Sequence, residues 1–260
     1  MNLIDTHMHL QDGDYDGDRA AVLDNMRAAG VCAAVVVGYD MPSSRTGLAL
    51  SHTYKNLFCV PGIHPHDAKN ATESDYAELL RMSADERVIG IGETGLDYHY
   101  DLSPRDVQRR VFVRHIGVAH EARLPLVVHI REAYEDALAV LSEARGLLNA
   151  GCLIHCFSGD LAVANKLVDA GFYLAFGGAI TYKRNEREAA AVLRSIPRAR
   201  ALLETDAPYL SPEPYRGKRN EPAHVKIVAE AVARAWGTES EEVASVTTAN
   251  ALRLFGRLSA

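Results

Sequence analysis

The chain has 260 residues, of which 48% are hydrophobic and 24% are charged. This composition is typical of a globular protein with a sizeable core, and it excludes the disordered and fibrous classes. The formal net charge of −6 argues against a broad electrostatic surface for duplex nucleic acid. No apolar run approaches the roughly 20 residues of a membrane-spanning helix, so we expect a soluble protein without a membrane partner.

Short apolar or β-branched runs alternate with longer amphipathic segments about every thirty residues, which predicts βα units and a parallel sheet. The predicted strands are 3–7, 31–37, 58–63, 88–93, 126–129, 153–155, 172–176 and 201–204. The predicted helices are 18–29, 43–54, 73–82, 104–122, 133–145, 162–170, 186–195, 224–236 and 240–255.

Local chemistry supports these ranges. In the helix predicted over 104–122, apolar residues recur at helical spacing and arginines occupy other faces. Ser103 and Pro104 predict a cap followed by proline at the first helical position. Three glycines lie between a helix and the next strand, where a left-handed conformation closes the helix: Gly30, Gly151 and Gly171.

No linker or low-complexity stretch divides the chain, so we predict one domain over residues 1–260. Eight βα units with buried strands close most naturally into a (β/α)8 TIM barrel, and an open doubly wound sheet is the competing fold. Polar residues at the carboxyl ends of the predicted strands favour the barrel. In a barrel those ends converge on one face, whereas in an open sheet they are spread along an edge.

The four cysteines indicate a reducing compartment. Cys32, Cys59, Cys152 and Cys156 lie in apolar, strand-like contexts, and no signal peptide precedes them. This pattern suits reduced, buried thiols in a cytoplasmic protein better than a disulfide framework. Cys152 and Cys156 flank His155, but no second Cys/His pair at zinc-finger spacing accompanies them, so a structural zinc site is the minor alternative.

The first predicted strand ends in two histidines, His7 and His9, with one residue between them. Alternation along an extended strand directs both rings to the same side, which is a chelating geometry. A His-X-His pair alone is equally consistent with a solvated or satisfied pair of side chains. Its meaning therefore depends on partners elsewhere in the chain.

The other strand ends supply imidazole and carboxylate groups, which suit zinc, manganese and other borderline divalent ions. The candidate ligands come from strands one, four, five, six and eight: His7, His9, Glu93, His129, His155 and Asp206. Six such groups exceed the need of one tetrahedral ion, so we predict two metals.

Glu93 is the natural bridge between the two ions, because a carboxylate can bind one ion through each oxygen. The remaining candidates then divide into two groups: His7, His9 and Asp206 on one metal, His129 and His155 on the other. Paired metals about 3.5–4 Å apart favour hydrolysis, since they lower the pKa of water and neutralise charge on a substrate oxygen. Asp206 or Glu204 would orient or deprotonate that water.

Six blocks of sequence carry a family resemblance. They are 4–9 (IDTHMH), 62–65 (GIHP), 90–97 (GIGETGLD), 125–131 (PLVVHIR), 155–159 (HCFSG) and 203–210 (LETDAPYL). In this order and spacing they resemble the signature blocks of TatD-family metal-dependent deoxyribonucleases, within the amidohydrolase superfamily. The resemblance implies a (β/α)8 barrel with one to three divalent ions at its carboxyl face, which cuts phosphodiester bonds of DNA, commonly as a 3′-to-5′ exonuclease.

Carried over position by position, the family's metal ligands fall on the six candidates already named. Glu204 resembles a family glutamate near the nucleophilic water, and Asn220 resembles part of the block after the eighth strand. Glu221, the neighbour of Asn220, departs from the commonest pattern, which touches substrate preference and not metal binding. His64 resembles a histidine of the third-strand block, and we interpret it as a group that holds a ligand in place.

Phosphate recognition needs cations near the metals. Arg131 follows candidate ligand His129, and Lys218 and Arg219 precede Asn220 in the loop after the eighth strand, so we predict substrate contacts from these four side chains. Lys183 and Arg184 are equally consistent with a solvated face. Three tyrosines could stack on bases or simply pack: Tyr182, Tyr209 and Tyr215.

The leading prediction is an enzyme, a hydrolase that uses two and up to three divalent ions (Mg²⁺, Mn²⁺ or Zn²⁺) to cut DNA. A narrow barrel mouth suits single strands and ends better than intact duplex, so we expect end-directed activity. One alternative is a hydrolase of small esters, amides or phosphoesters, or an aminoacyl-tRNA deacylase, with the same dinuclear centre. Another is a non-catalytic binding module, which the intact set of six ligands disfavours. The sequence predicts no oligomeric state.

Overall fold

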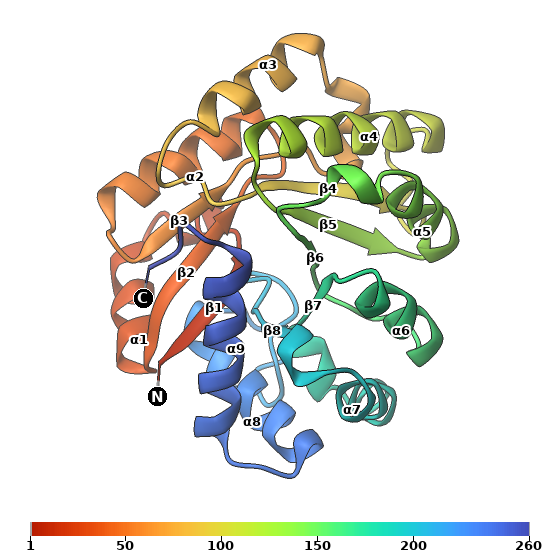
Figure 1. The fold of residues 1–260 in the computed structure, drawn as a ribbon. Coiled ribbons are helices and arrows are strands. Elements are labelled where there is room, and N and C mark those ends of the chain that lie inside the picture. The colour runs from red at the N-terminus through yellow and green to blue at the C-terminus, as the bar shows by residue number, and fades with distance from the viewer. Residues whose placement is uncertain (1, 260) are drawn as a thin grey trace.

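Figure 1 shows the computed structural model of the chain, which describes residues 2–259. The ends of the predicted domain, residues 1 and 260, lie outside this range. The strands are β1 (Leu3–Met8), β2 (Val31–Val37), β3 (Leu57–Val60), β4 (Ile91–Asp97), β5 (Leu126–Arg131), β6 (Cys152–Ile154), β7 (Tyr173–Phe176) and β8 (Ala201–Leu203). They alternate with helices that form an outer ring.

The α-helices are α1 (Arg19–Ala28), α2 (Met41–Thr53), α3 (Glu73–Met82), α4 (Arg105–Ala122), α5 (Tyr134–Glu143), α6 (Leu161–Asp169), α7 (Glu186–Ser195), α8 (Val225–Trp236) and α9 (Ser240–Leu254). Short 3₁₀ helices occupy η1 (Gly13–Tyr15), η2 (Pro65–Asn70), η3 (Arg145–Leu147), η4 (Gly178–Thr181), η5 (Arg198–Arg200) and η6 (Pro222–His224). None of the helices in the described part of the chain has the length and apolar character needed to cross a membrane.

The strands close into a barrel. Parallel pairing joins β1-β2-β3 and β4-β5-β6-β7-β8. Parallel bridges connect these two runs at both seams, between Met8 and Ala207 and between Cys59 and Val88. The backbone N–H of His9 also donates to the carbonyl of Ala207 at 2.7 Å. This closure confirms the predicted (β/α)8 architecture over the open sheet.

Alternation along the strands builds two packed layers. In β2, Val35 and Val37 belong to the cluster that fills the barrel interior, whereas Ala34 and Val36 belong to the cluster between strands and outer helices. The C-terminal helix α9 packs on β1 and β8 (Figure 1), and Phe255 at its end is fully buried in the interior cluster. The segment around α9 therefore closes the amino end of the barrel, and the carboxyl end remains for the loops.

Helix predictions agree closely with the structure, and α3 and α7 coincide with their predicted ranges. The cap at α4 was predicted wrongly, because Pro104 itself is the N-cap and Ser103 makes no capping bond. The Ser103 hydroxyl instead donates to the carbonyl of His66 at 2.8 Å and accepts from the Lys69 N–H at 3.1 Å. The three glycines do adopt positive φ: Gly30 (83°), Gly151 (111°) and Gly171 (91°).

The fourth strand differs from its prediction of 88–93, since β4 runs over Ile91–Asp97. The prediction ended at the first charged residue, but every residue of β4 is buried. Gly92 and Gly95 both have φ of 138°, and a Cβ at either would overlap a carbonyl oxygen of β5, at Val127 or His129. The glycines allow β4 to lie close against β5, and this pairing carries polar side chains into the barrel mouth.

Candidate metal centre

The six predicted ligands converge at the carboxyl end of the barrel. His7, Glu93 and His129 lie within strands β1, β4 and β5, and the other three follow the ends of β1, β6 and β8: His9, His155 and Asp206. Strand pairing fixes their backbones. The N–H of Asp206 donates to the carbonyl of His7 at 2.9 Å, and that of His155 donates to Val128 at 3.0 Å.

Glu93 is at the centre of this group, and its two oxygens face different histidines. Oε2 lies 3.2 Å from Nε2 of His7 and 3.8 Å from Nε2 of His9. Oε1 lies 2.8 Å from Nε2 of His155 and 3.0 Å from Nδ1 of His129. The carboxylate thus stands between two groups of imidazoles, which is the arrangement that a bridging ligand requires.

Asp206 completes the group around His7 and His9. Its Oδ1 lies 3.4 Å from Nε2 of His9 and 3.8 Å from Nε2 of His7. Ligand atoms of these three residues lie within 4.8 Å of one another, as do those of a second group formed by His64, Glu93 and His129. Neither group includes a cysteine.

The chemistry of these groups fits bound cations. Nε2 of His7 and Nε2 of His9 lie 3.3 Å apart, and both also face Glu93 and Asp206. Burial opposes ionisation of Glu93, but His155, His7 and His64 hold its pKa well below the usual value. Buried carboxylates that stay ionised among converging imidazole nitrogens are the donor set of a divalent metal site.

Hydrogen bonds behind the rings orient them. Nδ1 of His9 lies 2.8 Å from the carbonyl of Val37 and can only donate there, so its Nε2 presents a lone pair to the centre. Nε2 of His129 lies 3.0 Å from Oδ2 of Asp97, which leaves Nδ1 facing Glu93. Such contacts fix the tautomer of a metal-binding histidine and raise its basicity.

Asp97 is a functional residue. Reasoning from the sequence did not identify its partner, His129. Oδ1 of Asp97 caps the turn, since it accepts from the N–H groups of His99 and Tyr100. Its Oδ2 holds His129 and also lies 3.0 Å from Nε2 of His66. Burial raises the pKa of Asp97, and the His129 and backbone hydrogen bonds outweigh it and lower that pKa.

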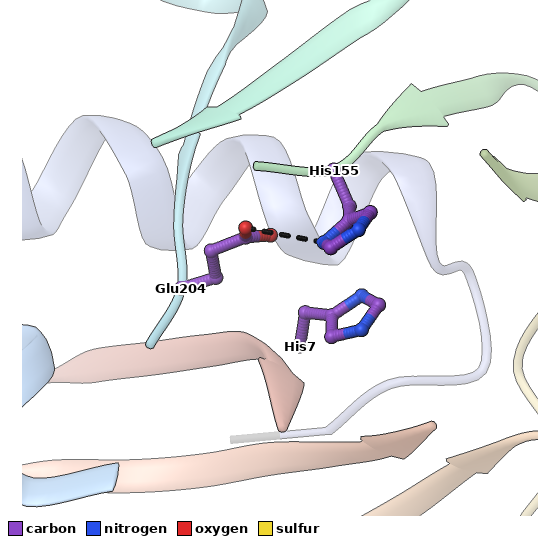
Figure 2. Close-up of side chains that lie close together, drawn as sticks. All are labelled: His7, His155 and Glu204. Atoms are coloured by element: carbon purple, nitrogen blue, oxygen red, sulfur yellow. Dashed lines mark ion pairs between the residues drawn. The ribbon is translucent and has the colours of Figure 1, made fainter. Parts of the chain in front are cut away.

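His64 lies beside a predicted ligand, because its Nε2 is directed at Oε1 of Glu93, at 3.6 Å, and its Nδ1 accepts from the His66 N–H at 3.1 Å. This contact is compatible with the role of holding Glu93 in place. A second predicted residue lies elsewhere than expected. Glu204 is fully buried behind His155, where its Oε1 lies 3.3 Å from Nδ1 and accepts from the Cys156 N–H at 2.6 Å. Figure 2 shows this arrangement. Glu204 therefore does not face the cleft in which a water would be activated.

A cleft of about 1100 Å³ opens over the centre. Its walls carry Arg131 and Arg184 as well as aromatic side chains. The Arg131 guanidinium lies 4.8 Å from the centre of the Tyr100 ring, and Tyr100 and Tyr209 are 53% and 51% exposed. The cleft thus combines cations and accessible aromatic rings beside the carboxylate and imidazole groups.

The structure does not bring residues 218–220 of the loop after β8 into this cleft. Arg219 forms a two-pronged ion pair with Asp18, at 2.6 and 2.9 Å. Asn220 is fully buried, and its amide donates to the carbonyls of Thr205 and Tyr209. Lys218 lies over a tyrosine ring away from the cleft lining. We therefore correct the predicted substrate contacts: of the four, Arg131 alone lines the cleft, and Asn220 braces the loop through the carbonyls of Thr205 and Tyr209.

The tyrosines and cysteines also separate by position. Tyr209 lines the cleft, whereas Tyr182 is buried and donates to the carbonyl of Ser211, and Tyr215 stacks on the ring of His224. All four cysteines are free thiols. Within residues 2–259, none of the side-chain groups with metal-binding spacing contains Cys152 or Cys156, which argues against the zinc alternative.

Comparison with known proteins places this chain in a family. The family described as TatD related DNase matches residues 4–256. An uncharacterized metal-dependent hydrolase, YabD of Bacillus subtilis, is 44% identical over 253 residues, 97% of this chain and 98% of that protein. A protein of Cronobacter sakazakii named 3′-5′ ssDNA/RNA exonuclease TatD is 32% identical over 97% of both chains.

The fold comparison agrees. The crystal structure of YJJV, a TatD homologue from Escherichia coli K12, superposes with a TM-score of 0.92 at 27% identity and covers 98% of each chain. A family match along nearly the whole chain, relatives of equal length and the buried histidine and carboxylate groups all agree. The chain belongs to the TatD family of metal-dependent hydrolases.

Proposed function

We propose that this protein is a phosphodiesterase that uses two divalent ions to remove nucleotides from the 3′ ends of single-stranded DNA. The observation that carries the proposal is the position of Glu93, whose two oxygens face two separate groups of imidazoles. The name of the Cronobacter relative supports the choice of nucleic acid as substrate. The cleft, with its cations and exposed aromatic rings, supports an unpaired strand.

Two groups would hold the ions, with Glu93 shared: His7, His9 and Asp206 in one, His129 and His155 in the other. His64 would hold Glu93, because its Nδ1 accepts from the His66 N–H and the proton of the neutral ring is then on Nε2, which faces Glu93. When bound, the ions would supply Lewis acidity and lower the pKa of a water. The nitrogen-rich donor set favours Mn²⁺ or Zn²⁺ over Mg²⁺.

Asp206 is the group that we propose to accept the proton from the attacking water. Its carboxylate lines the cleft, unlike that of Glu204. Burial raises the pKa of Asp206, but His9 and the neighbouring imidazoles outweigh it and lower the pKa, so the carboxylate is ionised near neutral pH. An ionised carboxylate beside the reacting water is a competent general base.

Arg131 would bind a phosphate of the substrate, because it is a cation in the cleft wall that follows His129 by two residues. Tyr100 and Tyr209 are positioned to stack on unpaired bases, since each exposes about half of its side chain at the cleft. Contacts to phosphate and to the faces of bases would let the cleft bind a single strand whatever its base sequence.

The test is an assay of the metal-loaded protein on single-stranded DNA, RNA and duplex DNA, labelled at either end. A panel of esters, amides and aminoacyl-tRNA runs beside them. We expect stepwise shortening of single-stranded DNA from its 3′ end, lost on chelation. The Glu93→Gln protein, prepared identically, excludes a contaminating nuclease. Hydrolysis of an ester or amide without cleavage of any oligonucleotide would overturn the proposal.

A further inference from the structure

One carboxylate lies behind two imidazoles that belong to different halves of the centre. His7 comes from β1 and His155 follows β6, and their rings stack with centroids 3.9 Å apart and planes 18° apart. A ligand atom from each of His7, His155 and Glu204 lies within 4.8 Å of the other two. Figure 2 shows Glu204 beside both rings, on the side of the ion pair with His155.

The hydrogen-bonding atoms of this trio are left over from the metal centre. Nε2 of His7 and Nε2 of His155 both face Glu93. A neutral imidazole that presents the lone pair of Nε2 to a metal ion carries its proton on Nδ1. Both Nδ1 atoms are buried, and neither makes a hydrogen bond of ordinary geometry within residues 2–259. Oε2 of Glu204 is equally buried and unpartnered among the same residues.

Two unpaired donors and one unpaired acceptor therefore belong to three side chains that meet in one buried place. Leaving such a group unsatisfied costs about 1–3 kcal/mol, so their mutual proximity is the economical arrangement. Within residues 2–259 the ion pair of Glu204 is with His155, and neither lysine nor arginine neutralises it. Burial of an ionised carboxylate is costly unless nearby positive charge or hydrogen bonds compensate, and two imidazoles bound to divalent ions would provide positive charge here.

We propose that Glu204 is a positioning residue that orients His7 and His155 together from behind and thereby couples the affinities of the two metal sites. The inference rests on the paired-metal site of the proposed function. It differs from the role near the nucleophilic water that the family resemblance implies, because Glu204 is fully buried and lies on the far side of His155 from Glu93.

The competing account is that Glu204 only fixes the loop after β6, through its hydrogen bond from the Cys156 N–H. Glu204→Gln separates the two roles. Glutamine keeps the size of the side chain and an oxygen beside Cys156 and His155, but it removes the negative charge and places an NH₂ donor at the position of Oε2. A loop-fixing role survives this change. Orientation of both imidazoles, which needs the charge and the second acceptor oxygen, does not survive it.

The experiment titrates metal-free protein with Co²⁺ and follows calorimetric heat and visible absorption, with no nucleic acid present. Wild type should bind two ions per chain. Glu204→Gln should weaken both by tenfold or more, the range found when partners of metal-binding histidines are removed. Asp97→Asn is the matched control, because Asp97 contacts His129 alone among the predicted ligands. It should weaken one ion and spare the other.

Glu204→Asp provides a second variant, since it retains an ionised carboxylate. It should weaken both ions to a similar degree and by less than glutamine does, with a thermal midpoint in chelator close to that of wild type. If the Glu204→Gln protein does not fold, equal weakening of both ions in Glu204→Asp supports the proposal on its own. Unchanged affinity, or weakening of one ion only, would contradict the coupling. Two ions in wild type without any nuclease activity would overturn the proposed function alone, whereas a single ion in wild type would overturn both.

Discussion

Glu93 is the side chain on which the paired site depends, because each of its oxygens faces a different group of histidines. Glu93→Gln removes the negative charge and one acceptor while keeping the volume of the side chain. We expect metal content and oligonucleotide hydrolysis to fall together, hydrolysis by orders of magnitude. Metal analysis and the end-labelled assay on one preparation check this. Retention of wild-type activity would refute the bridging role.

His115 links the acid stability of the protein to a single buried ring. Its Nε2 accepts from the Ile63 N–H at 3.1 Å and its Nδ1 donates to the carbonyl of Val111 at 2.8 Å, so the folded state holds it neutral. Burial lowers its pKa from 6.5 to about 4. The unfolded chain therefore binds a proton first as the pH falls. The contribution of His115 to the free energy of unfolding is about 3 kcal/mol. It is fully present above pH 6.5 and is lost progressively as the pH falls to about 4.

Urea unfolding of chelator-treated protein between pH 4.5 and 7 measures this contribution of His115 to the free energy of unfolding. The free energy of unfolding should fall with acidification less steeply in His115→Gln than in wild type. Equal slopes in the two proteins would show that His115 does not cause the loss.

Among individual residues, the sequence was enough to identify the six converging groups, because histidine and carboxylate at the ends of apolar runs are local patterns. It could not identify the partners that orient them. Asp97 and the Val37 carbonyl become neighbours of His129 and His9 only through strand pairing and loop packing. The same holds for Glu204, whose distance from the cleft depends on which side of His155 it occupies.

Among the elements, the loops that follow the strands decide which cations can reach substrate. Arg131 lines the cleft, whereas Arg219 is paired with Asp18. Arg131→Ala should raise KM about tenfold, change kcat less and reduce the salt dependence of binding by about one phosphate contact. Arg219→Ala is the matched control and should leave KM and its salt dependence at wild-type values. Steady-state kinetics at several salt concentrations distinguish the two variants. A raised KM in Arg219→Ala and an unchanged KM in Arg131→Ala would show that the loop after β8 binds the substrate and Arg131 does not.

Helix α9 closes the amino end of the barrel, and Phe255 just beyond it is the large side chain that fills the opening. Phe255→Ala should destabilise the protein by about 3–5 kcal/mol, through lost burial and the cavity left behind. Leu252→Ala, at a position that is 37% exposed in the same segment, should cost far less. Denaturant unfolding of both proteins checks the difference, and equal stability would show that the end of the barrel is not tightly packed.

Helices and most strands could be predicted from periodicity, because burial of one face repeats along the chain. The β4 prediction failed because its polar residues are buried by the site and not exposed by a loop. Ser103 failed as a cap because His66 and Lys69, distant in sequence, use its hydroxyl. Both errors arise where tertiary contacts override local preference.

At the scale of the whole molecule, barrel closure is what turns separate strand ends into one centre. Bridges at both seams join the first three strands to the last five, and this brings His7 of β1 within 3.9 Å, ring to ring, of His155 after β6. The alternation of elements, together with the polar residues at the strand ends, was enough to predict this closure. The contents of the cleft were not predictable, since loop packing and not composition decided which arginine faces it.

The rate of 3′-end shortening of single-stranded DNA, measured against equivalents of Mn²⁺ added to metal-free protein, shows whether two ions act together in this centre. Because both halves of the centre share Glu93 and act on one reaction, activity should stay low through the first equivalent. It should then rise to its maximum as the second binds. Full activity at one equivalent per chain, or none at any metal content, would contradict the account.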